Sequence, residues 1–487
     1  MSPVPDALPS EDLASLDLSP SAMEAMGHAV VTRAVAHLAS LAEQPSHGDL
    51  DAAARCRALS ETVPEHGTAL EPLLDLLFDD LIPRSFTTAG PGYLAYIPGG
   101  GVYPAALADF IADTTNRFTG IWAAAPALVQ LEATALDWVR DWMQFPATTR
   151  GLFTTGGSMA TFNAILCARE RHLGVDIRRG TIYTSSQAHH CVEKSAKLAG
   201  IAHDRVRLVP VDSQYRMRVD ALVDAVAADR AAGLTPFMVV SAAGTTNTGA
   251  VDPLDGIADV AAREGLWHHI DGAYGACFHL VPELRPLLDG LARGDSLTLD
   301  PHKGMFLPYG TGALLVRDGE ALRAVHASTA GYLPENQSEF YDPAQYGPDL
   351  SRGFPGLRVW LTLKLFGAAR YRAALAEKRS LAVWAAGQVA EIPGIVMDAP
   401  PQLSLFTFHI RAEDRAAEDA ATRELIDAVT ARGKVMITGC VAEGRVLARV
   451  CVLSFRTRRA EVELAVTQLR EEAARIRATL GLSAGPS

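Results

Sequence analysis

Short apolar, β-branched segments alternate with helical segments from residue 150 to about residue 317. The expected strands are 180–186, 205–210, 235–244, 266–271, 296–300 and 312–318, and the expected helices between them are 157–172, 190–199, 219–231 and 254–264. Repeated strand–helix–strand units build a mostly parallel sheet whose two faces are covered by helices. This alternation constrains the fold more than any other feature, and it indicates the α/β class.

Different patterns flank this central region. Helical spacing of apolar residues occurs at 21–43, 69–81, 104–116 and 126–143. A long loop at 330–355 precedes a helix from 356 to about 390, and the remainder predicts strands near 410 and 450 and helices at 415–432 and 459–480. We therefore predict an N-terminal helical arm (1–104), a large domain (105–355) and a small α+β C-terminal domain (356–487).

Composition and charge exclude several classes of protein. The formal charge of −12 argues against a nucleic-acid partner, and no run approaches the roughly 18 apolar residues of a membrane span. The first twenty residues are acidic and lack the basic start of a signal peptide. Six cysteines without CxxC spacing indicate neither a disulfide framework nor a metal site. We expect a cytoplasmic protein with no membrane or nucleic-acid partner.

One lysine stands where chemistry is expected. The chain has only six lysines, and Lys303 follows a predicted strand that ends at Asp300. Ligands of open α/β sheets bind beyond the carboxyl ends of strands. The Lys303 amine could form a Schiff base with an aldehyde if burial or a nearby cation lowers its pKa. His302 adjoins it. The alternative is an ordinary solvated loop lysine.

A carboxylate ends a neighbouring predicted strand. Asp271 follows an apolar run and precedes small residues that include Ala273. A poorly solvated carboxylate needs a cationic partner, and a protonated pyridine nitrogen is one, with the ring lying over Ala273. The alternative is an aspartate that caps the next turn. Asp271 and Lys303 are one strand–helix–strand step apart, which predicts that both lie at the same sheet edge.

Three further segments add to this edge. Gly156, Gly157 and Ser158 precede a helix whose free N–H groups could bind a phosphate, although Ser158 could also be a simple helix cap. His189 and its neighbour His190 stand between a strand and a helix, where an imidazole can lie on an aromatic ring or merely begin the helix. Thr246 offers a hydroxyl after another strand. Together these groups are the parts needed to hold pyridoxal phosphate.

Several motifs resemble those of the pyridoxal-phosphate-dependent group II amino-acid decarboxylases. The resemblance covers about residues 20–475 and is carried by GGSMAT (156–161), AHHCVEK (188–194), GTTNTGAVDPL (244–254), HIDGAYG (269–275) and DPHKG (300–304). The stretch 92–139 is most similar to the aromatic-L-amino-acid decarboxylase branch. The resemblance implies an aspartate-aminotransferase-like large domain (fold type I) with a mainly parallel seven-stranded sheet. It also implies a homodimer with shared active sites.

The resemblance implies a role for each matching residue. Lys303 would bind the cofactor covalently, Asp271 would pair with the pyridine nitrogen, and His189 and Ala273 would lie on opposite faces of the ring. Gly156, Gly157 and Ser158 would hold the phosphate, with Asp300 and His302 nearby, and Thr246 would hydrogen-bond at the cofactor. Tyr332, in a loop after the lysine region, would protonate Cα after carbon dioxide leaves.

The expected activity is α-decarboxylation of a small-molecule L-amino acid, with an aromatic or other apolar side chain favoured, to an amine and carbon dioxide. The alternatives are an oxidative aldehyde synthase, an aminotransferase on the same fold, and an inactive homologue that has lost the covalent link. Gly304, the glycines of 97–101 and His190 depart from the family pattern, and each is expected to reshape the substrate pocket.

Overall fold

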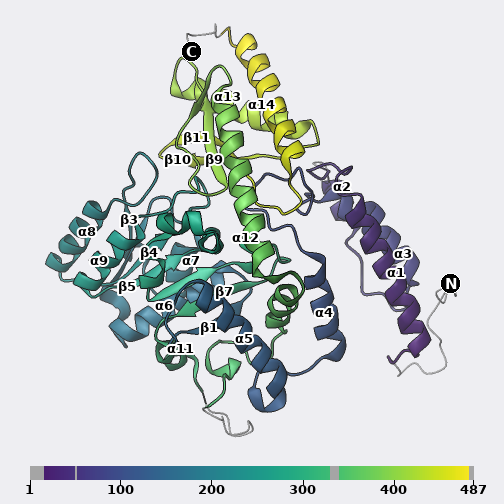
Figure 1. Ribbon diagram of the computed structural model, residues 1–487, viewed down its shortest axis with the longest axis horizontal. Coiled ribbons are helices and arrows are strands. Elements are labelled where there is room, and N and C mark those ends of the chain that lie inside the picture. The colour runs from purple at the N-terminus through teal and green to yellow at the C-terminus, as the bar shows by residue number, and fades with distance from the viewer. Residues whose placement is uncertain (1–15, 50–51, 329–338, 482–487) are drawn as a thin grey trace.

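The computed structural model describes residues 16–49, 52–328 and 339–481, and in it the alternating region forms one twisted sheet (Figure 1). The sheet order is β1-β7-β6-β5-β4-β2-β3, and only β7 runs antiparallel to its neighbours. Its strands are β1 (Arg150–Thr154), β2 (Gly180–Ser185), β3 (Val206–Val209), β4 (Thr235–Ala242), β5 (Trp267–Asp271), β6 (Ser296–Leu299) and β7 (Gly312–Val316). The predicted mainly parallel, seven-stranded sheet is confirmed.

Helices cover both faces of this sheet. The helices between its strands are α6 (Gly157–Leu173), α7 (Cys191–Leu198), α8 (Val219–Ala231), α9 (Leu254–Glu264), α10 (Pro301–Gly304) and, after β7, α11 (Gly319–His326). Before β1 come α1 (Pro20–Ala39), α2 (Ala53–Ala58), α3 (Leu70–Asp75), α4 (Tyr103–Thr115) and α5 (Pro126–Trp142). The parallel strands therefore point their carboxyl ends at one edge, where α6, α7 and α10 begin.

The C-terminal part is a second layer of sheet and helix. An antiparallel sheet in the order β10-β11-β9-β8 packs against two helices. These elements are β8 (Ile395–Met397), β9 (Leu405–Ile410), α13 (Arg415–Ala431), β10 (Thr438–Ala442), β11 (Arg445–Cys451) and α14 (Arg459–Thr479). The boundaries proposed for the three domains stay a prediction.

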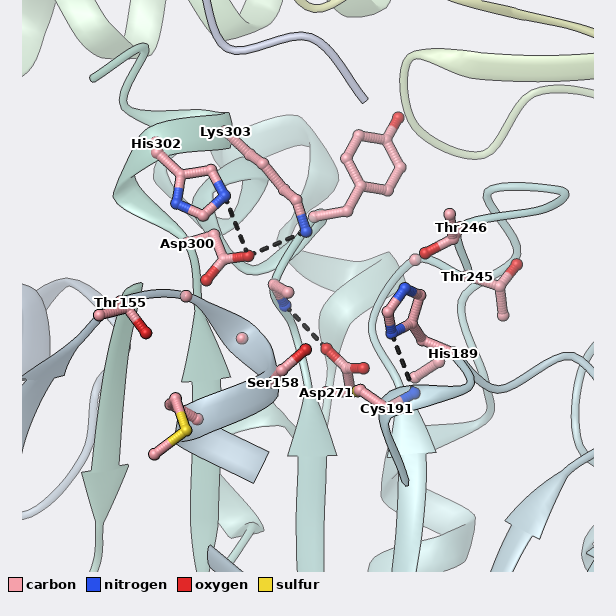
Figure 2. A pocket seen from close by; sticks show the side chains of 17 residues that line it. Thr155, Ser158, His189, Cys191, Thr245, Thr246, Asp271, Asp300, His302 and Lys303 are labelled. Atoms are coloured by element: carbon pink, nitrogen blue, oxygen red, sulfur yellow. Dashed lines mark hydrogen bonds and ion pairs between the residues drawn. The ribbon is translucent and has the colours of Figure 1, made fainter. Parts of the chain in front are cut away.

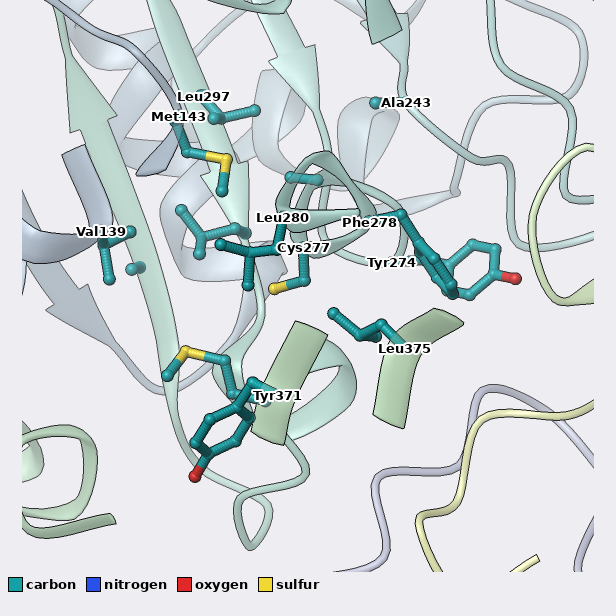
Figure 3. Close-up of a cluster of buried hydrophobic side chains, with 14 of the residues drawn as sticks. Val139, Met143, Ala243, Tyr274, Cys277, Phe278, Leu280, Leu297, Tyr371 and Leu375 are labelled. Atoms are coloured by element: carbon teal, nitrogen blue, oxygen red, sulfur yellow. The ribbon is translucent and has the colours of Figure 1, made fainter. Parts of the chain in front are cut away.

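Helix α12 (Pro355–Ala390) links the two sheets and is kinked. Gly367 has φ 71° and ψ 153°, so the predicted continuous helix is two helices that meet at this residue. Val359 and Tyr371 pack into the core beside the large sheet, whereas Leu381 and Val389 pack into the core of the small one. In Figure 3, Leu375 lies near Phe278 and Tyr274, while the ring of Tyr371 stacks on that of Phe306. One helix thus contributes to both cores.

Two buried histidines on β5 make the large domain sensitive to acid. His268 bonds Ser241 Oγ through Nε2 (2.8 Å), and His269 lies between Ser296 Oγ (2.8 Å) and Thr298 Oγ1 (3.2 Å). Burial lowers the pKa of His268 to about 3 and that of His269 to about 4. Because an unfolded histidine has a pKa of about 6.5, their stabilising contribution is complete above that pH and is lost as the pH falls toward 4.

We expect the free energy of unfolding to fall between pH 7 and pH 5 by about 2 kcal/mol for each of these histidines. Urea titrations at several pH values measure this slope. In the variant His269→Gln, the fall in the free energy of unfolding that these two histidines cause should be about half as large. A slope unchanged in the double variant His268→Gln/His269→Gln would contradict the assignment.

Candidate active site

A cavity of about 260 Å³ opens at the carboxyl edge of the large sheet. Its lining includes Gly156, Gly157, Ser158, His189, Thr246, Asp271, Ala273, Asp300, His302 and Lys303. The structure therefore brings together the site residues predicted from the sequence, except Tyr332, which lies outside the described residues. Figure 2 shows how they face one another.

Lys303 lies on α10, directly after the end of β6. Its Nζ is 2.9 Å from Asp300 Oδ2, and its side chain is 21% exposed. Burial acts to lower the pKa of Lys303, but the charge and hydrogen bond of Asp300, with the charge of Asp271, raise it above its usual value. The condition that burial or a nearby cation lowers the pKa of this amine is therefore not met here, because the carboxylates of Asp300 and Asp271 raise it.

The partners of Asp300 and His302 define the wall beside Lys303. Asp300 Oδ1 is buried without a hydrogen-bond partner among the described residues, while Oδ2 lies 3.5 Å from His302 Nε2. His302 Nδ1 donates to the carbonyl of Thr311 at 2.8 Å. Burial lowers the pKa of His302, and the nearby Lys303 cation lowers it further despite the opposing Asp300 charge. His302 is therefore a neutral neighbour with a fixed ring orientation.

Asp271 sits at the last position of β5, across the cavity from α10. Its Oδ1 accepts the amide of Ala273 at 3.1 Å, so it does cap the following turn, as the alternative interpretation held. Its carboxylate still lines the cavity. Capping the turn and lining the cavity are therefore compatible, and the pairing of Asp271 with a pyridine nitrogen stays a prediction.

His189 occupies the loop between β2 and α7. Its Nδ1 accepts the amide of Cys191 at 3.2 Å, and its ring centroid is 4.1 Å from that of His190. Burial lowers the pKa of His189, which the charge of Asp271 partly opposes. A neutral ring that accepts at Nδ1 keeps its proton on Nε2. His190 precedes α7 as its cap residue and does not line the cavity.

The amino end of α6 supplies the predicted anion site. Gly156 is the cap residue of this helix, so Ser158 is a helical residue rather than the cap. A side chain at Gly157 would place its Cβ 3.1 Å from Ala273 Cβ and 3.2 Å from Asp300 Oδ2. A side chain here would require these neighbours to shift by a few tenths of an ångström, so glycine suits this close approach, and the N–H groups of the helix end can bind an anion.

Close packing explains why glycine occupies positions 304 and 99, where the sequence departs from the family pattern. A Cβ at Gly304 would lie 2.4 Å from Cys277 Cβ, and Gly304 does not line the cavity. A Cβ at Gly99 would lie 1.9 Å from the carbonyl oxygen of His302. Cys277 therefore fills the space beside Gly304, and the expected effect of Gly304 on the substrate pocket stays a prediction. Gly99 brings the segment 97–101 against the lysine turn.

Sequence reasoning missed Arg449 on β11. This buried guanidinium donates to the carbonyls of Thr246 (2.6 Å), Asn247 (3.3 Å) and Tyr96 (3.1 Å) and to Thr438 Oγ1 (2.9 Å). It holds the Thr246 loop in place from the small domain. An arginine within the apolar run of 446–453 was the available signal, because such a charge must find partners.

Comparison with known proteins decides the family. Residues 54–411 match the model of the pyridoxal-dependent decarboxylase conserved domain. The chain belongs to this family. The decarboxylase is 32% identical to an aromatic-L-amino-acid decarboxylase of Bacillus atrophaeus, over 91% of this chain and 94% of that protein. It is 27% identical to a phenylacetaldehyde synthase of Arabidopsis thaliana, over 86% of this chain and 89% of that one.

Solved structures agree with the aspartate-aminotransferase-like fold. The crystal structure of Oryza sativa TDC with PLP and tryptamine superposes with a TM-score of 0.91 at 26% identity, covering 95% of this decarboxylase and all of that chain. The residues present fit the cofactor of the family. A buried, unpartnered Asp300 oxygen, an amine and a glycine-lined helix end face one cavity. The enzyme is a pyridoxal-phosphate-dependent amino-acid decarboxylase.

Proposed function

We propose that the enzyme removes the α-carboxyl group of an L-amino acid with an aromatic or other apolar side chain, and that it releases the amine and carbon dioxide. The observation that carries this proposal is the convergence of Lys303, Asp271 and His189, from three strand ends, on one cavity. When bound, pyridoxal phosphate supplies an aldehyde for amines and a ring that accepts the electron pair released at Cα.

Each wall of the cavity has a proposed task. Lys303 would hold the cofactor covalently, and its amine must first lose a proton, for which Asp300 Oδ2 is the acceptor in place at 2.9 Å. Asp271 would keep the pyridine nitrogen protonated. His189 and Ala273 would cover opposite ring faces, with Thr246 at the cofactor's polar edge. Gly156, Gly157 and Ser158 would bind the phosphate near His302.

The apolar substrate class is supported by the similarity to an aromatic-L-amino-acid decarboxylase. In the segment before α4, Tyr93 and Tyr96 stack with ring centroids 6.5 Å apart, but neither lines the cavity. Arg449 and Arg456 lie beside this segment, and both donate to backbone carbonyls, Arg456 to those of Ala89 and Gly100. These guanidinium groups are therefore engaged, and an acidic substrate side chain gains little from them.

A mixture of the twenty amino acids plus L-DOPA and ornithine, with amines identified by mass, tests this proposal. We expect an amine from an aromatic or apolar member of the mixture. Keto acids without carbon dioxide would instead identify an aminotransferase. Aldehyde with hydrogen peroxide would identify the second candidate, an oxidative aldehyde synthase, which the similarity to a phenylacetaldehyde synthase favours.

The covalent link can be tested directly. Because Lys303 is the lysine that lines the cavity, we expect borohydride reduction of the holoenzyme to fix the pyridoxyl group on Lys303. Peptide mapping by mass spectrometry locates the group. Lys378 is the internal control, since it is buried and bonds the carbonyl of Thr457 away from the cavity. A label on Lys378 or another lysine would refute the assignment.

We also propose a homodimer. Helix α1 has no buried residue, and Figure 1 shows α1–α3 standing beside the body of the chain. On α4, Phe110 is 63% exposed and Ile111 47%. Apolar surface of this kind is typical of an interface. Sedimentation should give twice the mass of one chain, and Phe110→Asp should shift it to one chain. A wild-type enzyme that sediments as a monomer would contradict the proposal.

The cellular compartment stays a proposal as well. Among the described residues, the helices are all too short or too polar to cross a bilayer. All six cysteines are free, which suits the reducing cytoplasm that we propose.

A further inference from the structure

The β10–β11 hairpin of the small domain contacts both loops that flank the ring side of the cavity. Arg449 and Cys440 hold the loop that carries Thr246, and Cys440 Sγ donates to the carbonyl of Asn247 at 3.6 Å. At the tip of the hairpin, Glu443 Oε1 accepts Ser186 Oγ at 2.9 Å and Gln187 Nε2 at 3.0 Å. The second loop is the one that carries His189.

The glutamate at this tip is not explained by the turn itself. Ala442 pairs with Arg445, and the two residues between them, Glu443 and Gly444, have φ of 45° and 73°. A two-residue hairpin turn with both φ positive favours Asn, Asp or Gly at its first position. A glutamate at this position adopts a left-handed backbone conformation, which is strained for a residue with a long side chain. Its side chain reaches the His189 loop, and this contact accounts for its presence.

Burial and local hydrogen bonds also restrict the loop that Glu443 contacts. Gln187 is 3% exposed, its amide donates to Ser185 Oγ (3.3 Å), and the amide of Ala188 donates to the carbonyl of Ser185. His189 follows two residues later and is tied forward by the Cys191 amide. A shift of Gln187 therefore moves the His189 ring within the cavity.

We infer that Glu443 is a positioning residue for the cofactor site: by holding Ser186 and Gln187, it sets the His189 ring against the cofactor without touching the cofactor itself. The small domain thereby contributes to cofactor affinity through this side chain as well as through Arg449 and Cys440. This inference rests on the proposed placement of His189 on the ring face.

Two variants separate the effect of side-chain length at position 443 from its effect on the stability of the turn. Glu443→Asn suits the left-handed turn but is one methylene too short, whereas Glu443→Gln keeps the reach and an acceptor oxygen. The readouts are the dissociation constant of pyridoxal phosphate from the apoenzyme and the visible circular dichroism of the bound cofactor. Thermal unfolding checks the fold, and Glu413→Asn, at an exposed glutamate of the same domain, is the matched control.

We expect Glu443→Asn to raise the dissociation constant about tenfold, as for the loss of two hydrogen bonds at a partly exposed site, and to weaken the dichroic band. Glu443→Gln should stay within about threefold of wild type. The unfolding temperature of Glu443→Asn should not fall, because its turn is better satisfied.

Two results would overturn the inference. One is wild-type affinity and dichroism in Glu443→Asn, and the other is an equal loss in the Asn and Gln variants, which would make the charge rather than the reach decisive. His189→Gln separates this failure from that of the proposed site. If His189→Gln alters the dichroic band and Glu443→Asn does not, only the role of Glu443 fails. If His189→Gln alters nothing, the placement of His189 fails, and this inference fails with it.

Discussion

Asp271→Asn should fold normally and lose about a thousandfold in turnover, as for loss of a preorganised electrostatic interaction of about 4 kcal/mol. The substitution is nearly isosteric, and Asn Oδ1 can still accept the Ala273 amide that Asp271 Oδ1 accepts at 3.1 Å. What it removes is the negative charge opposite the proposed position of the pyridine nitrogen. Turnover is measured as carbon dioxide and amine released by the cofactor-saturated enzyme.

Asp295→Asn is the matched control for this variant. Asp295 Oδ2 also accepts a backbone amide, that of His268 at 2.8 Å, but Asp295 precedes β6 and so lies at the opposite edge of the sheet. Burial raises the pKa of Asp295, so loss of its charge should be well tolerated. Turnover near wild type in Asp271→Asn, with cofactor bound, would show that a different group protonates the ring.

Tyr332→Phe should change the product from amine to aldehyde. The resemblance places Tyr332 as the acid that protonates Cα, and removing its hydroxyl leaves Lys303, Asp271 and the phosphate site intact. Without that proton, the carbanion formed by loss of carbon dioxide persists long enough for oxygen to oxidise it. Oxygen is then reduced to hydrogen peroxide, and water releases aldehyde and ammonia. The measurement is the ratio of amine to peroxide per carbon dioxide released under air.

Tyr341→Phe serves as the control for Tyr332→Phe. Tyr341 is a partly buried tyrosine nine residues later, and its hydroxyl donates to the carbonyl of Gly151 at 3.2 Å, so its loss should affect stability and not the product ratio. An unchanged ratio and turnover in Tyr332→Phe would remove Tyr332 from the proposed mechanism. His189, which holds a proton on Nε2, would be the next acid to test.

The parallel core could be predicted from local patterns because each unit there has its own periodicity. Helices α8 and α9 have the expected bounds, and strands β2–β7 lie within one or two residues of expectation. The strands that were missed are β1, β8 and β10. Strand β1 pairs with β7, which is distant in sequence, whereas β8 and β10 pair with the strands that follow them, β9 and β11. Their pairing, rather than their composition, makes them strands.

The residues of the site also divide into those that local sequence patterns predict and those that they do not. Strand order brings Asp271 and Lys303 to one edge, so their proximity follows from topology. Arg449 and Glu443 reach this edge from the small domain, whose docking no local pattern encodes. The raised pKa of Lys303 was likewise missed, because the sequence does not show that Asp300 Oδ2 lies 2.9 Å from its amine.

Because of the kink at Gly367, a small change in the backbone torsion of this residue moves the far end of α12 by a large distance. The segment after it, residues 368–390, is about 35 Å long at 1.5 Å per residue. A 5° change in the torsion of one glycine therefore displaces the far end by about 3 Å, the length of a hydrogen bond. The position of the small sheet relative to the cavity loops therefore depends in part on this single backbone angle. Geometrical tolerance at the active site is thus set partly by a residue far from the chemistry.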